Sequence, residues 1–184
     1  MRTRTGLLVA VMALAANVAL ASTGERKDLQ VFNDISKTVN RYTRYTIFDD
    51  VNASVDHGVV TLTGKVTMPY KRDEIARRVA KVDGVRQVQN HLEVLPVSIE
   101  DARLRYRIAR AIYGNAAFWS DAAMVNPPIH IVVEHGRVTL TGVVGSETDR
   151  MLARALASQF GVMSVTNQLK TDAEARESLE HISH

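Results

Sequence analysis

The spacing of apolar residues changes along the chain, and these changes predict its secondary structure. Over residues 28–42 apolar side chains recur at three- and four-residue steps, the spacing of one face of an α-helix. Residues 41–50 break this spacing, and we expect them to form a loop with exposed aromatic residues. The period then becomes two on both sides of a short turn at residues 56–58, which predicts a β-hairpin with one buried face. A helix over residues 70–82 and a further alternating segment, closed by Pro96, complete a helix–strand–strand–helix–strand unit.

The second half of the chain repeats this order. Ser98 and Asp101 have the spacing of a capping box and begin a helix that runs to about Tyr113. A hairpin over residues 129–144, a helix beginning at Ser146 and a last strand follow. The sequence therefore predicts an α+β fold of two tandem α-β-β-α-β units, each a small three-stranded sheet with two helices on one face.

An internal repeat supports the division into two units. The sequence H-G-V-V-T-L-T-G at residues 57–64 returns as H-G-R-V-T-L-T-G at residues 135–142, with seven of the eight positions identical. Glycines, small apolar residues, threonines and asparagines recur, whereas almost every charged residue varies. We interpret the recurring glycines as turn and stop residues and the recurring asparagines as amides that bind nearby backbone. These fold-signature residues are Gly58, Gly64, Gly84, Asn90, Gly136, Gly142, Gly161 and Asn167.

The first residues have the pattern of an export signal. Arg2 and Arg4 precede an apolar run over residues 7–20, and small residues then stand at positions 19 and 21. A membrane anchor is the alternative, but the run is shorter than the roughly 20 residues that a span needs. We expect a signal peptide over residues 1–21, disorder over residues 22–27, units at 28–96 and 98–171, and a flexible tail at 172–184.

The composition limits the cellular compartments and the kinds of site that we expect for the protein. The 184 residues are 46% hydrophobic and 23% charged, as in ordinary globular proteins. Two of the three excess positive charges belong to Arg2 and Arg4, which leaves +1 after cleavage and indicates no nucleic-acid partner. The chain has no cysteine, which excludes disulfides, thiolate metal sites and a lipidated cysteine. We expect a periplasmic protein, exported with cleavage near residues 21–22 and not lipidated.

The repeated motif resembles that of the BON domain (bacterial OsmY and nodulation). The pattern G-x-V-x-L-x-G at residues 58–64, followed after a helix by V-x-x-V-x-N-x-L at residues 85–92, returns at residues 136–142 and 162–169. The resemblance implies a non-enzymatic envelope module that is associated with phospholipid surfaces, osmotic stress and, in some cases, chaperoning of exported proteins.

Residues that could carry catalysis or bind metal do not form a recognisable set. His57 and His135 recur, but both lie in hairpin turns, where turn geometry explains them. His130 and His135 are five residues apart across a strand end, which is not a known ligand spacing. We therefore expect no enzyme, no cofactor and no metal.

Two segments of the second unit could bind lipid. Arg103, Arg107 and Arg110 follow one stripe of the first helix, away from its apolar face, and could bind anionic headgroups. The alternative is a solvated face paired with Glu100 and Asp101. Phe118 and Trp119 lie in a segment that the first unit lacks, and aromatic rings suit a membrane–water boundary. The alternative is that Trp119 covers the core or the junction between the units.

Two functions follow as expectations. The first is peripheral association with anionic phospholipid through these five residues, which would support envelope integrity under osmotic stress. The second is a periplasmic chaperone that holds exported client proteins on exposed apolar surface. The sequence leaves the oligomeric state open.

Overall fold

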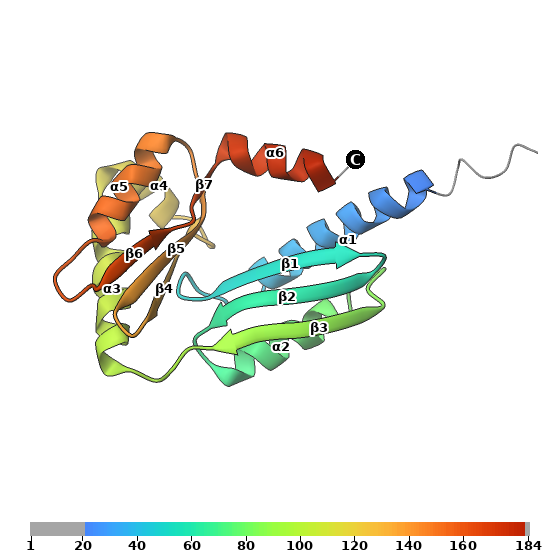
Figure 1. Cartoon of the computed structure of the whole chain (residues 1–184), viewed down its shortest axis with the longest axis horizontal. Helices are drawn as coiled ribbons and strands as arrows, with labels where there is room; N and C mark the ends of the chain where they lie inside the picture. Colours follow the sequence, from blue (N-terminus) through green and yellow to red (C-terminus); the bar gives the residue numbers. More distant parts are fainter. Residues whose placement is uncertain (1–20, 183–184) are drawn as a thin grey trace, which may run out of the picture.

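The structure is a computed structural model that describes residues 21–182, and it consists of two similar units (Figure 1). The predicted signal peptide lies outside the described residues, apart from Ala21. The first unit contains α1 (Ala21–Asn40), β1 (Asp50–Asp56), β2 (Val59–Val66), α2 (Pro69–Val79) and β3 (Gln87–Val94). The second contains α3 (Ile99–Tyr113), η1 (Ala116–Phe118), α4 (Trp119–Ala122), β4 (Ile129–Glu134), β5 (Arg137–Val144), α5 (Glu147–Ala157), β6 (Ser164–Asn167), β7 (Lys170–Thr171) and α6 (Asp172–Ile182).

Both sheets have the same topology, and the predicted fold class is confirmed. The first sheet has the order β1-β2-β3, with an antiparallel hairpin and a parallel third strand. The second has the order β4-β5-β6, and β7 continues the pairing with β5. Its third strand is thus divided between Asn167 and Lys170. In each unit the two main helices contact one another and the sheet, and a core of Val, Ile and Leu fills the space between these layers.

The repeated histidine–glycine pair forms the hairpin turn in both units. His57 and His135 have φ of 49° and 51°, and the following glycines also have positive φ, as a tight primed turn requires. In the second unit the Asp101 carboxylate accepts the backbone N–H groups of both turn residues at 2.8 Å. Asp28 on α1 does the same for the first turn. A carboxylate on the first helix of each unit therefore fixes the turn, and the histidine backbone is part of that contact.

The recurring asparagines join the third strand to the second helix. The amide of Asn90 donates to the Arg72 carbonyl of α2, and its oxygen accepts the Leu92 N–H. Asn167 makes the equivalent bonds to the Arg150 carbonyl of α5 and the Leu169 N–H. Both amides thus bind backbone groups of the scaffold. The six signature glycines all have positive φ.

The ends of the described chain differ from expectation. Helix α1 begins at Ala21, so the expected disorder over residues 22–27 is wrong. Residues 172–182, which we expected to belong to a flexible tail, form the helix α6. Thr171 explains where α6 begins, because its hydroxyl accepts the Glu174 N–H while the Glu174 carboxylate accepts the Thr171 N–H. Among the described residues, no helix has both the length and the apolar character to cross a membrane.

Candidate functional site

Three arginines of α3 form a basic stripe on the surface of the second unit. The basic stripe consists of Arg103, Arg107 and Arg110, which are all exposed, while Leu104 and Ile108 on the opposite side of the helix are buried. Arg103 pairs with Glu100 at 3.1 Å, and both side chains are more than 70% exposed. An exposed pair of this kind contributes at most about 1 kcal/mol, so Arg103 can exchange it for another anion.

The aromatic pair beside the stripe divides between the core and the surface. Phe118 is 1% exposed and belongs to the hydrophobic core of the second unit. The expectation that Phe118 inserts into lipid is therefore contradicted. Trp119 begins α4, which contacts α3, and is 76% exposed. It covers neither the core nor the junction between the units, so of the two alternatives the exposed one holds.

Three exposed apolar side chains on α5 and on the segment that follows it were missed from the sequence. We call Met151, Phe160 and Met163 the apolar edge; Phe160 is 94% exposed. The Arg107 guanidinium donates to the Phe160 carbonyl, which joins the apolar edge to the basic stripe. The repeat could have revealed these residues, because at the aligned positions the first unit has charged residues instead.

The first unit lacks both features at the aligned positions. The buried residues of α1 and α3 align with a shift of 73, since Val31 and Ile35 correspond to Leu104 and Ile108. The positions of the basic stripe then correspond to Gln30, Asp34 and Lys37, of which the last two pair at 3.1 Å. In the second helix the shift is 78, and around the aligned glycines Gly84 and Gly161 it is 77. The positions of the apolar edge therefore correspond to Asp73, Asp83 and Arg86. The face that is basic and apolar in the second unit is thus mixed in charge in the first.

Residues 41–49, which we call the junction loop, bring the two units into contact. The sequence had predicted a loop with exposed aromatic residues over residues 41–50. Tyr42 is 5% exposed in the first core, and Phe48 packs against the second core and edge-on to Tyr106 at 5.2 Å. The Ile47 carbonyl accepts the N–H of Ile131 in β4 at 2.6 Å. That expectation is therefore wrong, since aromatic residues that seemed to face solvent bury the contact between the units.

A buried acid holds the junction loop in place. Asp49 is 0% exposed and binds the Lys71 ammonium at 2.6 Å. Its two oxygens also accept the backbone N–H and hydroxyl groups of Thr46 and Thr67. A buried ion pair is stable only when the remaining lone pairs are also satisfied, as they are here.

His130 lies at the centre of the junction. Its Nδ1 is 2.6 Å from the Asp49 carbonyl oxygen, and its ring stacks at a tilt on Tyr45 with 5.2 Å between centroids. Burial lowers the pKa of His130 below its ordinary value of 6.5, although the surrounding carbonyl and carboxylate oxygens act in the opposite direction. The histidine therefore stabilises the junction in its neutral form.

One group of side chains has the spacing of metal ligands. In the part of the chain that the structure describes, Asp28, Asp56 and His57 bring ligand atoms within 4.8 Å of one another. Both Asp28 oxygens already accept the backbone N–H groups of the turn, and His57 Nδ1 contacts Asp56 at 2.5 Å. These contacts explain the group as part of the turn.

The repeated scaffold matches one protein family. The BON domain model matches residues 34–96 and 115–173, which together make up most of the chain. The chain belongs to the BON domain family. This confirms the resemblance seen in the sequence and makes each unit a BON domain, a module that is associated with phospholipid binding and envelope stress and is generally non-enzymatic.

Comparisons with whole proteins add little. Among solved structures, the chain is similar to CdsD, a structural protein of the type III secretion system of Chlamydia trachomatis, at 12% identity and a TM-score of 0.30, covering 80% of this chain and 97% of that one. The C-terminal domain of CdsD gives 13% identity and a TM-score of 0.25, covering 74% and 96%. No curated protein matches the chain.

Proposed function

We propose that the protein is a non-enzymatic, exported envelope protein that associates peripherally with anionic phospholipid surfaces through its second BON domain. The observation that carries the proposal is the exposed basic stripe, which contacts the apolar edge at Phe160 and lies on α3, the helix that α4 with its exposed Trp119 contacts. Its setting would be the periplasm, where such binding would support envelope integrity under osmotic stress.

The energies of the two components are sufficient for reversible binding. Each basic residue near an anionic surface contributes about 1 kcal/mol, so the basic stripe supplies roughly 3 kcal/mol. An exposed aromatic side chain contributes about 1.5–3 kcal/mol when it is fully buried in lipid. Trp119 can supply such a contact without unfolding, because it is already exposed and its neighbour Phe118 anchors the segment in the core.

Binding to vesicles of defined composition tests the proposal. Trp119 is the only tryptophan, so its fluorescence reports on the second domain alone. We expect sedimentation with phosphatidylglycerol vesicles and a blue shift of the emission, but neither with phosphatidylcholine. Raising the salt should weaken binding, because the screening length falls from about 10 Å at 0.1 M to about 3 Å at 1 M.

Trp119→Ala separates insertion from folding. The variant should sediment more weakly with phosphatidylglycerol vesicles while keeping its thermal stability, since the side chain contributes little to the core. If wild-type protein neither sediments nor shifts its emission at low salt, the proposal is wrong.

A further inference from the structure

The two hairpins present equivalent edge strands, but only one of these edges is covered. β1 and β4 pair with their partners in the same register, so that Ala53 opposite Leu62 corresponds to Ile131 opposite Leu140. The N–H of Ile131 points away from its sheet and donates to the Ile47 carbonyl of the junction loop. The N–H of Ala53 must therefore also point outward from β1, and the described residues contain no backbone acceptor for it.

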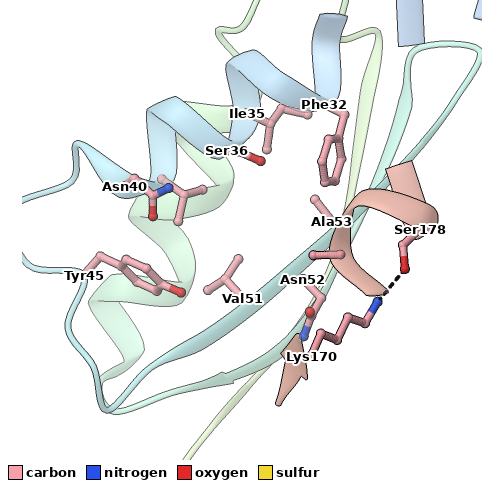
Figure 2. A pocket seen from close by; sticks show the side chains of 12 residues that line it. Phe32, Ile35, Ser36, Asn40, Tyr45, Val51, Asn52, Ala53, Lys170 and Ser178 are labelled. Carbon is pink, nitrogen blue, oxygen red and sulfur yellow. Dashed lines mark hydrogen bonds between the residues drawn. The ribbon is translucent and has the colours of Figure 1, made fainter. Parts of the chain in front are cut away.

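The uncovered edge of β1 borders a groove of about 440 Å³ (Figure 2). Three mainly apolar positions of α1 (Phe32, Ile35 and Val39) line it, together with Val51 and Ala53 of β1. The opposite wall belongs to the second domain, where Ala175 and Ser178 of α6 and Lys170 of β7 face the groove. Lys170 is the one charged residue among the described side chains that line it, and its ammonium bonds to the Ser178 hydroxyl at 3.2 Å.

Tyr45 closes one end of the groove and connects it to the junction. Tyr45 and Val51 line the same groove. In the second domain the Tyr113 hydroxyl donates to the Ile129 carbonyl and accepts the Ile129 N–H, at the position of β4 that is aligned with Val51. The two edges differ at the next outward-facing residue, where β4 meets Ile47 and β1 meets the groove.

We infer that the groove beside β1 binds an extended segment of another polypeptide, which adds to the first sheet as a further strand. The covered edge of β4 shows which groups bind to such an edge. A backbone carbonyl, that of Ile47, receives the hydrogen bond of the outward N–H, and an apolar side chain, that of Phe48, packs on the adjacent core. An uncovered edge strand offers the same hydrogen bonds to an incoming chain. The apolar floor favours alternate apolar side chains in that chain, and Lys170 favours an acidic group.

Residues of α6 line the groove opposite β1, which favours a single extended strand as the occupant over the edge of a second folded sheet. Pairing of two β1 edges between copies of the protein is a separate outcome of the test below. The inference does not depend on lipid binding, since the groove lies between α1, β1 and α6 and shares no residue with the basic stripe or the apolar edge.

A peptide copied from the junction loop and the start of β1 is a suitable probe, because the chain already places this sequence on an equivalent edge. The labelled, acetylated peptide T-R-Y-T-I-F-D-D-V, residues 43–51, would be titrated into the full mature protein. We expect saturable binding and slower hydrogen exchange at the amides of Ala53 and Val55. No binding at about 1 mM peptide would overturn the inference, as would protection confined to β4. Protection of β1 that rises with protein concentration alone would also overturn it, since a second copy would then be the occupant.

One substitution tests the edge hydrogen bond directly. Ala53→Pro removes the outward N–H and is compatible with an edge strand, whereas Ala53→Gly disturbs the strand but keeps the donor. We expect Ala53→Pro to weaken peptide binding about five- to tenfold relative to Ala53→Gly, which corresponds to the loss of one hydrogen bond. Equal affinity in the two variants would contradict the inference. Amide hydrogen exchange of the groove residues in the unbound variants shows whether each variant is folded. If Ala53→Pro is misfolded, Ala53→Arg is used instead, because its side chain fills the groove and should abolish peptide binding.

Discussion

In the first BON domain the outer positions of the helices carry charges of both signs, many of them paired, whereas the aligned positions of the second domain carry three arginines, one of them paired with Glu100, and exposed apolar side chains. Arg107 takes the place of Asp34, and Phe160 takes the place of Asp83. The residues that build the turns and the core hardly change between the two. Within one chain, the same scaffold thus occurs twice with two different surfaces, of which that of the second domain is the more basic and apolar.

The domains also differ in their buried ion pairs, and removing the pair of the first domain should have a large effect on stability. The Asp49–Lys71 pair belongs to the first domain alone, because the aligned position in the second domain is Pro127. Asp49→Ala leaves a buried ammonium without its partner and should lower the free energy of unfolding by about 3–5 kcal/mol. Urea unfolding followed by circular dichroism measures this loss. The control is Asp56→Ala, which removes an exposed acid of the same domain and should change the free energy of unfolding by less than about 0.5 kcal/mol. Similar losses in both variants would contradict the stabilising role of the buried Asp49–Lys71 pair.

The carboxylates that fix the hairpin turns allow a matched comparison between the domains. Asp101 is 2% exposed and Asp28 is half-buried, although both accept two turn amides. Replacing a buried acceptor leaves its donors unsatisfied, at about 1–3 kcal/mol. We expect Asp101→Ala to cost about 2–3 kcal/mol and Asp28→Ala about 1 kcal/mol in urea unfolding. A larger loss for Asp28 would mean that burial does not determine the strength of the contact.

Exchanging residues between the domains tests the apolar edge. Phe160→Asp introduces the residue of the first domain and should weaken binding to phosphatidylglycerol vesicles by about 2 kcal/mol, roughly thirtyfold. Folding should be unaffected, since the side chain is 94% exposed. The reciprocal Asp83→Phe is the control: a gain in lipid binding would show that exposed aromatic surface suffices without the basic stripe.

The smallest effect concerns pH and the junction. The folded-state pKa of His130 is lowered by burial, so neutral His130 is fully stabilising above its unfolded pKa of 6.5. That stability is lost as the pH falls below 6.5 toward the lowered folded value. Asp49, Asp50 and Tyr45 face the ring. Urea midpoints between about pH 7 and pH 5 should fall more steeply for wild type than for His130→Gln, and parallel curves would exclude this role.

The repeat made most of the fold predictable, because periodicity and turn chemistry are local. It failed where distant contacts decide. The aromatic residues of the junction loop were expected to face solvent, and only their packing on the second domain explains Phe48. Asp49 and Lys71 are 22 residues apart in sequence, and no local pattern connects them. Phe118 and Trp119 are adjacent and chemically alike, so the sequence could not show that one enters the core while the other faces solvent.

If the proposed function is correct, the second domain directs lipid binding and the net charge of the protein does not. Two triple variants separate these possibilities, because each removes three positive charges: R103Q/R107Q/R110Q in the second domain and R77Q/R78Q/K81Q in the first. At about 1 kcal/mol for each residue, the first variant should bind phosphatidylglycerol vesicles roughly a hundredfold more weakly, while the second should stay close to wild type. Equal losses in both variants would contradict the account.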